Sequence, residues 1–267
     1  MQGEEGAGRG PAQVRQEEAG MAEVIPLEDA RLKKIFSYPR YTDERYRRVV
    51  EGLRALGVEG AVPTGSLEIE GLRVLGKGCV GMVLAGIFKG ERVAFKVLRT
   101  DANRESLKEE ARLLSVANEM GVGPKLIASA DSVMIMEYID GRYLSKWLEE
   151  PHATEEVMHV IRDLLSQCYR LDEAGLDHGE LSDAKKHILI DQKGRPHILD
   201  FETASMKRRR RNFVSMLSYL FFKGSIATLV GRYLCWNGSN LRGMIRRYKE
   251  TPSRTEYEGI MRELGLD

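Results

Sequence analysis

Three glycines between two strand-like stretches constrain this chain more than any other feature. Gly76, Gly78 and Gly81 separate residues 67–75 from residues 82–88, and both stretches show the two-residue hydrophobic period of β-strands. A third such stretch, residues 92–98, follows a turn at residues 89–91. The sequence therefore predicts an antiparallel meander with a glycine-rich hairpin. Because glycine lacks a Cβ, the amides of this hairpin can approach an anion closely.

The string from Gly76 to Val83 reads G-x-G-x-x-G-x-V. Taken alone, it fits an ordinary hairpin equally well, and it also describes dinucleotide folds, where the glycines lead from a strand into a helix. Here a strand follows, which favours a flexible hairpin that covers nucleotide phosphates. The residues expected at the nucleotide are Gly76, Lys77, Gly78, Cys79, Val80, Gly81 and Val83.

A lysine follows on the next predicted strand. In the string Val93-Ala94-Phe95-Lys96, Ala94 and its apolar neighbours would hold the Lys96 ammonium over the phosphate site. Residues 101–120 predict a helix, on which Glu110 shares a face with the apolar residues. We expect Glu110 to pair with Lys96 and to orient it. The alternative is a glutamate-rich surface helix in which Glu109 is the equivalent residue.

The second half of the chain supplies acidic groups. Residues 177–182 form an acidic loop, and residues 187–190 and 197–202 predict two short strands around a hairpin. Asp200, which leaves the second strand, can chelate a Mg²⁺ ion that bridges nucleotide phosphates. Glu180 in the loop can orient or deprotonate an attacking hydroxyl, and Asp183 is the alternative for that role.

These motifs, in this order, resemble the eukaryotic-type protein kinase superfamily over about residues 70–205. The loop His178-Gly179-Glu180-Leu181-Ser182 is similar to the H-G-D-L-S loop of RIO-type atypical kinases, compact forms of which are typical of archaea. The resemblance implies an α+β, two-lobed fold: a small antiparallel sheet with one helix, a reduced and mainly helical second lobe, and ATP between them. Residues 136–139 resemble the hinge, with Met136 as gatekeeper and the backbones of Glu137 and Ile139 at the adenine.

The chain departs from the kinase pattern at three site positions. Glu180 replaces the catalytic-loop aspartate, and His187 replaces the asparagine that would hold a second metal ion. Since histidine is a poor Mg²⁺ ligand, that second metal site is doubtful. Glu202 replaces the glycine after Asp200-Phe201, so that the string resembles the D-[FW]-E of choline-kinase and aminoglycoside-type phosphotransferases. No A-P-E string follows, and 65 residues remain after Glu202.

The remainder of the chain falls into predicted segments. Residues 1–20 are expected to be a disordered tail, and Met21 is then a candidate for the true start. Residues 21–66 are expected to form a helical prefix, with Thr42 as the N-cap of a helix and residues 57–65 as the exit loop. Residues 67–267 are the expected kinase-like domain, divided into lobes 67–138 and 139–267. A long amphipathic helix is expected at 154–173.

Charge and cysteine content add expectations about location and partners. The net charge is +1, but residues 203–267 carry 13 Lys and Arg against 5 Asp and Glu, including the run Lys207–Arg211. This run predicts an acidic partner, either a phosphoprotein or RNA, or else a solvated basic loop. Three cysteines without C-x-x-C spacing and the lack of a secretory signal predict a cytoplasmic protein. The apolar segments around residues 213–230 predict buried core helices and no membrane span.

Together these features predict transfer of the γ-phosphoryl group of Mg·ATP to a hydroxyl, with a serine or threonine of a protein as the expected acceptor. Lys96, Glu180 and Asp200 are the expected catalytic residues. The alternatives are a small-molecule phosphotransferase, a non-catalytic nucleotide-binding or RNA-associated factor, and an ATPase.

Overall fold

The computed structural model describes residues 23–267, so the predicted tail and Met21 lie outside the described residues. The chain divides into two compact units, Met1–Glu105 and Ser106–Asp267. The elements of the first unit are α2 (Leu32–Phe36), α3 (Asp43–Ala55), β1 (Val58–Val62), β2 (Leu67–Ile69), β3 (Leu72–Val74), β4 (Gly76–Lys77), β5 (Gly81–Phe88) and β6 (Glu91–Leu98). The predicted lobe boundary at 138/139 remains a prediction.

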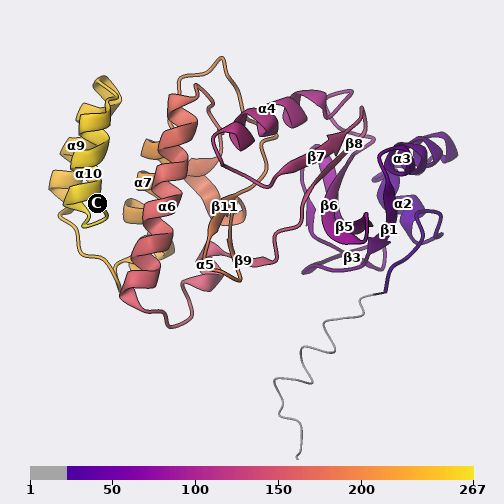
Figure 1. Ribbon diagram of the computed structural model, residues 1–267, viewed down its shortest axis with the longest axis horizontal. Helices are drawn as coiled ribbons and strands as arrows, with labels where there is room; N and C mark the ends of the chain where they lie inside the picture. The colour runs from indigo at the N-terminus through magenta and orange to yellow at the C-terminus, as the bar shows by residue number, and fades with distance from the viewer. Residues whose placement is uncertain (1–22) are drawn as a thin grey trace, which may run out of the picture. The chain divides into compact units, whose positions relative to one another are not determined.

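The predicted antiparallel pairing of residues 82–88 with residues 92–98 is present in the first unit. Strand β5 is flanked by β1 and β6, both antiparallel to it (Figure 1). The short strand β4 also pairs with β5. The β5–β6 ladder runs from the Gly81–Leu98 pair to the Phe88–Glu91 pair. Between these two pairs, Lys89 and Gly90 both have positive φ (52° and 75°). Two positive φ values are what a type I′ turn requires, and this turn matches the right-handed twist of the two strands. This ladder places Lys96 opposite Val83.

Two sequence expectations about the first unit are wrong. Residues 57–65 were expected to be a loop, but β1 lies within them and pairs with β5, with Ala61 opposite Gly86. Because glycines flank and interrupt this segment, its sequence does not show the pattern of a short strand, although its residues are mostly buried. Residues 67–75 are not one strand, because Glu70 and Gly71 take positive φ and fold them into the separate β2–β3 hairpin.

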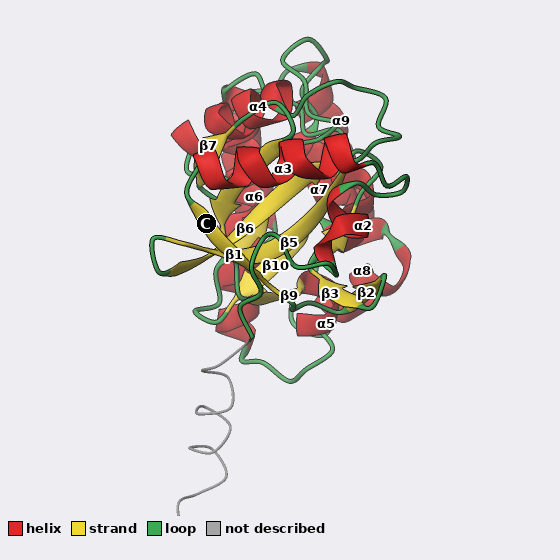
Figure 2. Ribbon diagram, turned by 90° about the vertical axis from the view of Figure 1, so that its right-hand side faces the viewer, coloured by secondary structure: helices red, strands yellow, loops and turns green. Residues whose placement is uncertain are grey.

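The helical prefix belongs to the same compact unit as the meander. Helix α3 begins after Thr42, whose hydroxyl accepts a hydrogen bond from the backbone N–H of Arg45 at 3.2 Å, as the sequence predicts. In Figure 2, α3 lies across the strands of the sheet. Phe36 at the end of α2 is fully buried and meets the ring of Phe95 on β6 edge to face, with centroids 6.1 Å apart.

The second unit is mainly helical. Its elements are α4 (Lys108–Glu119), β7 (Leu126–Ser129), β8 (Val133–Glu137), β9 (Gly141–Tyr143), α5 (Leu144–Trp147), α6 (Thr154–Glu173), the 3₁₀ helix η1 (Leu181–Lys186), β10 (Ile188–Asp191), β11 (Pro196–Ile198), α7 (Asn212–Phe222), α8 (Gly224–Val230), α9 (Gly238–Glu250) and α10 (Arg254–Glu263). Helix α6 has the predicted bounds, whereas α4 begins seven residues later than expected.

Helix α6 is the central element of this unit. It packs against α7 and against β11, the edge of a three-stranded sheet ordered β11-β10-β9. Helices α9 and α10 pack against each other near the C-terminus (Figure 1). Among residues 23–267, no single helix is long and apolar enough to span a membrane; α7 and α8 meet that test only as a pair, which bends by 78°.

A pair of glycine substitutions tests the packing of the first unit. A Cβ on Gly86 would lie 2.7 Å from a ring carbon of Phe95 and 2.8 Å from the carbonyl oxygen of Gly60. We therefore expect Gly86→Ala to lower the free energy of unfolding by about 2 kcal/mol in urea denaturation.

The matched control is Gly243→Ala on α9, where a Cβ meets no atom within 4 Å. This change should raise the free energy of unfolding by about 0.5 to 1 kcal/mol, because alanine is the better helix former. Equal effects of the two substitutions would contradict the packing described for Gly86.

Candidate functional site

The first unit contains the glycine-rich hairpin and Lys96. The Lys96 side chain is only 3% exposed, on a strand whose last six residues are all buried. Gly81 permits this placement: a Cβ there would lie 2.5 Å from Cε and 2.7 Å from Cγ of Lys96. The third glycine of the motif is therefore required by the aliphatic part of the lysine, which crosses the strand at that point.

The hairpin itself is closed by backbone hydrogen bonds. The N–H of Gly78 donates to the carbonyl of Gly81 at 2.8 Å, and the N–H of Leu75 donates to the carbonyl of Val83 at 2.9 Å. Lys77 and Cys79 are exposed at its tip, while Val80 is buried. The loop thus presents backbone and two exposed side chains over a buried lysine on the neighbouring strand.

The second unit holds the remaining predicted residues. Glu110 on α4 is 3% exposed, whereas Glu109 is exposed and pairs with Arg112 at 2.8 Å. On β8, the predicted hinge begins with the half-buried Met136, and the N–H of Glu137 donates to the carbonyl of Lys125 at 2.9 Å. The N–H of Glu137 therefore already has a backbone partner. Ile139 is half-buried.

A buried histidine organises the acidic loop. His178 is fully buried, and its Nε2 donates to the carbonyl of Leu199 at 3.0 Å, which fixes the tautomer with the proton on Nε2. The ring also meets Phe201 with centroids 5.0 Å apart. His178 thus contacts the residues on both sides of Asp200 and positions the segment after β11 that carries this carboxylate.

Asp200 has a backbone conformation that non-glycine residues seldom adopt. Its φ is +66°, and its Oδ1 accepts a hydrogen bond from the N–H of Glu202 at 3.3 Å. Such strain persists where the surrounding structure enforces it, and it concentrates at functional sites. Phe201 provides part of that enforcement, since it packs close to Gly123, where a Cβ would lie 2.9 Å from the Phe201 ring.

Glu180 and Asp183 differ in their surroundings. Asp183 forms an ion pair with Lys223 at 3.1 Å, and this lysine holds the pKa of Asp183 below its usual value. Glu180 lies 3.7 Å from Nε2 of His187. His187 Nδ1 is buried without a hydrogen-bond partner among residues 23–267, and its ring meets that of His178 with centroids 5.5 Å apart.

A hydrogen-bond network that the sequence pattern did not indicate connects the acidic loop to α6 and α7. Asp172, at the end of α6, accepts hydrogen bonds from the backbone N–H groups of Asn212 and Phe213 and from the Asn212 side chain, at 2.8 to 3.1 Å. Asn212 in turn accepts from the N–H of His178 at 2.8 Å. Burial raises the pKa of Asp172 to about 6, even though these donors favour its charged form.

The segment after Asp200 is tied to the same loop. Asp177 and Ser205 exchange two backbone hydrogen bonds, and Arg208 pairs with the Asp177 carboxylate at 2.9 Å. Gly179 has a φ of +94°, and a Cβ there would collide with Arg208 at 2.5 Å and with Thr203 at 2.8 Å. The glycine in the His178-Gly179-Glu180 string is therefore required by backbone conformation and by close packing.

Two further interactions near this site were missed from the sequence. Tyr143 on β9 is paired with Leu189 on β10, and burial together with the Asp200 carboxylate raises its pKa. Arg210 donates to the carbonyl of Asp172 at 2.8 Å, so part of the basic run serves to hold this network. Neither contact has a local sequence signal, because each joins segments that are distant in the chain.

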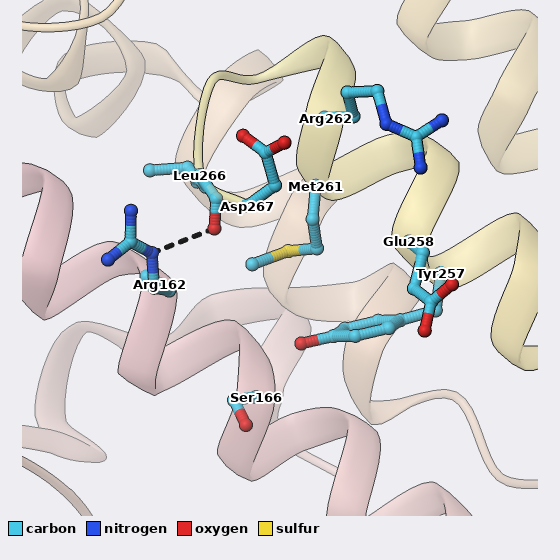
Figure 3. A pocket seen from close by; sticks show the side chains of 8 residues that line it. All are labelled: Arg162, Ser166, Tyr257, Glu258, Met261, Arg262, Leu266 and Asp267. Atoms are coloured by element: carbon cyan, nitrogen blue, oxygen red, sulfur yellow. Dashed lines mark hydrogen bonds between the residues drawn. The ribbon is translucent and has the colours of Figure 1, made fainter.

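A separate cavity of about 420 Å³ lies between α6 and α10 (Figure 3). Arg162 on α6 borders it and donates through Nε to the carbonyl of Leu266 at 2.8 Å. Ser166 and Tyr257 also line it. None of the residues predicted to bind nucleotide or metal borders this cavity.

His178 gives a test of the site through the pH dependence of stability. Burial lowers its pKa to about 4, with a smaller contribution from His187. Between pH 6.5 and about 4 the unfolded chain binds a proton at this residue and the folded chain does not, so its contribution to stability is present above pH 6.5 and is lost as the pH falls.

The variant His178→Phe removes this contribution. The difference in unfolding free energy between wild type and variant should shrink towards low pH by up to about 1.4 kcal/mol per pH unit in this window. Comparing the two proteins cancels the opposing contribution of Asp172, whose raised pKa favours the folded state at low pH. A pH-independent difference would contradict a buried neutral histidine.

Comparisons with known proteins give the family of this chain. The family model of the RIO domain matches residues 88–218. An uncharacterized protein of Methanocaldococcus jannaschii is 32% identical over 95 residues, which are 36% of this chain and 79% of that protein. The KEOPS complex subunit Bud32 of Pyrococcus abyssi is 34% identical over 104 residues, 38% of this chain and 46% of that protein, so the match spans less than half of that subunit. The predicted resemblance is confirmed, and the chain belongs to the RIO-like family of atypical protein kinases and ATPases.

Proposed function

We propose that this protein transfers the γ-phosphoryl group of ATP to a hydroxyl group of a protein serine or threonine. The observation that carries the proposal is the left-handed conformation of Asp200, held by Phe201 and by the buried His178. This conformation costs energy, and neighbouring side chains enforce it at the first carboxylate after β11. In phosphoryl transfer, where the protein does little covalent chemistry, such positioning supplies much of the catalysis.

In this proposal Lys96 and the hairpin of residues 76–81 contact the phosphates, and Glu110 orients Lys96. The burial of Lys96 and Glu110 supports these roles, since charged side chains are seldom buried without an electrostatic purpose. Met136 would line the adenine site, with the backbones of Glu137 and Ile139 as its hydrogen-bonding groups. The N–H of Glu137 already has a backbone partner, which favours its carbonyl for that contact.

Asp200 would hold a Mg²⁺ ion. Among residues 23–267, no three His, Cys, Asp or Glu side chains gather into a metal site, but Mg²⁺ in phosphoryl-transfer sites is held by one or two carboxylates together with substrate phosphates. The half-buried Asp200 fits that requirement, and the ion would supply charge neutralisation for the phosphates. His187 does not fit, because its Nε2 lies beside Glu180 and imidazole suits other metals.

Glu180 would orient the acceptor hydroxyl and accept its proton. Asp183 is the weaker candidate, because Lys223 pairs with it and lowers its pKa, which reduces its ability to accept a proton. We expect Glu180→Gln to lower kcat for phosphoryl transfer by about 10² to 10⁴ and Asp183→Asn to change it by less than about threefold. Steady-state kinetics with radiolabelled ATP measure both, and the reverse order would assign the role to Asp183.

A second pair of variants tests the phosphate and metal roles. Lys96→Met and Asp200→Asn should each abolish phosphoryl transfer to within background, whereas the exposed Glu109→Gln should retain wild-type turnover. Circular dichroism and thermal unfolding establish that the variants fold. Unchanged turnover of Asp200→Asn would show that the protein is not a catalyst of this type.

The acceptor is tested by offering alternatives. Glu202 favours a small-molecule acceptor by its resemblance to other phosphotransferases, and water is the acceptor of an ATPase. Label from γ-³²P-ATP should appear on serine or threonine of a protein, either this chain itself or an added substrate, and not on amino alcohols or aminoglycosides. Release of inorganic phosphate alone would instead assign an ATPase.

The basic run Lys207–Arg211 remains a candidate surface for an acidic partner, either a phosphoprotein or RNA. Three of its arginines already have partners within the chain. Arg208 pairs with Asp177, Arg209 donates to the carbonyl of Lys249, and Arg210 donates to the carbonyl of Asp172. These contacts leave Lys207 and Arg211 as the side chains best suited to a partner. We therefore expect any such partner to depend on these two residues first.

A further inference from the structure

The tip of the glycine-rich hairpin is held by a tyrosine from the N-terminal prefix. Tyr38 follows α2 and precedes the region matched by the family model by 50 residues. The Lys77 ammonium donates a hydrogen bond to the Tyr38 hydroxyl at 2.8 Å and lies 4.7 Å from the ring centroid. The second residue of the G-x-G-x-x-G string is therefore attached to an element outside the motif.

Arg99, just after β6, completes this attachment. Its guanidinium lies 5.2 Å from the Tyr38 ring centroid and donates to the carbonyl of Gly78 at 2.7 Å. Asp101 holds the guanidinium in place with two hydrogen bonds of 2.7 and 2.8 Å. Tyr38 thus contacts two cations. Lys77 belongs to the loop itself, and Arg99 binds the loop backbone at Gly78.

The backbone of Tyr38 is itself anchored. Its carbonyl accepts hydrogen bonds from the N–H of Thr100 at 2.9 Å and from the Thr100 hydroxyl at 3.2 Å. The N–H of Arg40 donates to the same hydroxyl at 3.3 Å. Next to it, Phe36 is buried against Phe95 on β6. Tyr38 is consequently held by the segment that directly follows β6, the strand that carries Lys96.

We propose that Tyr38 is a positioning residue that holds the glycine-rich loop, and with it the Lys77 ammonium, ready to receive nucleotide phosphates. This inference rests on the proposed function for the identity of the ligand. The Tyr38 phenol holds the Lys77 ammonium without neutralising its charge, so this cation remains able to attract phosphate. A carboxylate in the same place would fix the lysine but would also cancel its charge.

The test uses the full chain and two measurements. Titration with a fluorescent ATP analogue and with adenosine measures affinity, and hydrogen exchange without nucleotide measures the opening of residues 76–81. The variants are Tyr38→Phe, which keeps the ring, Tyr38→Ala, which removes both contacts, and Lys77→Met. The matched control is Tyr41→Phe, because Tyr41 is exposed and its hydroxyl donates to the nearby Asp43 rather than to the loop. Thermal unfolding verifies that each variant folds.

We expect Tyr38→Phe to weaken binding of the ATP analogue about threefold to tenfold, as the loss of one hydrogen bond does, and to leave adenosine binding unchanged. Tyr38→Ala should also speed exchange in residues 76–81 at least tenfold. Tyr38→Phe combined with Lys77→Met should weaken binding no more than Lys77→Met alone, because the two changes remove the same interaction. Tyr41→Phe should match wild type in both measurements.

The two proposals fail in different ways. If wild type binds the ATP analogue but Tyr38→Ala leaves its affinity and the loop exchange unchanged, the inference about Tyr38 is wrong while the proposed function stands. If wild type binds no nucleotide, the proposed function fails and the phosphate role of Lys77 fails with it. Equal weakening of ATP and adenosine binding by Tyr38→Phe would also overturn the inference, since it would indicate a general structural effect.

Discussion

The buried carboxylate of Asp172 is the interaction on which the second unit depends. It lies where α6 ends and accepts three hydrogen bonds from the first two residues of α7, which would otherwise leave N–H groups without partners at a buried helix start. Through Asn212 the same network reaches the backbone of His178. The longest helix, the apolar helix α7 and the acidic loop are therefore joined by one charged group.

This arrangement has an energetic consequence. Burial raises the pKa of Asp172 to about 6 and lowers that of His178 to about 4, so each group resists charging. As the pH falls below about 6, protonation of Asp172 favours the folded state whereas the His178 contribution is lost. Two residues linked by Asn212 thus make opposing contributions to the pH dependence of the free energy of unfolding.

The sequence predicted those parts of the fold that have local signals. Helix α6 has twenty residues with an uninterrupted apolar face, and the β5–β6 hairpin has a turn at Lys89-Gly90, so both could be placed closely. Strand β1 could not, because it is short and its Gly60 lacks a side chain to show the pattern. The motif predicted Gly81 as a residue at the nucleotide. Its close approach to the Lys96 side chain could not be predicted, because that contact depends on strand register.

The residues missed from the sequence share one property: their partners are distant in the chain. Asn212 bonds with His178 from 34 positions away, and Lys77 bonds with Tyr38 from 39 positions away. No periodicity or spacing rule reports such pairs, because a polar residue at the start of a helix or in a loop has many possible partners. Motif reasoning therefore yielded candidate site residues and overlooked the groups that hold them in place.

The basic run shows how structure changes the meaning of a composition. As a sequence, Lys207–Arg211 indicates five equivalent charges that attract an acidic partner. In the fold, Arg208 and Arg210 are bonded to the loop and to the helix end that support the site, and Arg209 bonds to the end of α9. A partner that bound all five would compete with these contacts. Binding of an anion to this run would therefore be coupled to the acidic loop through Asp177, and the charge block is better understood as a link between the site and the C-terminal helices than as an independent surface.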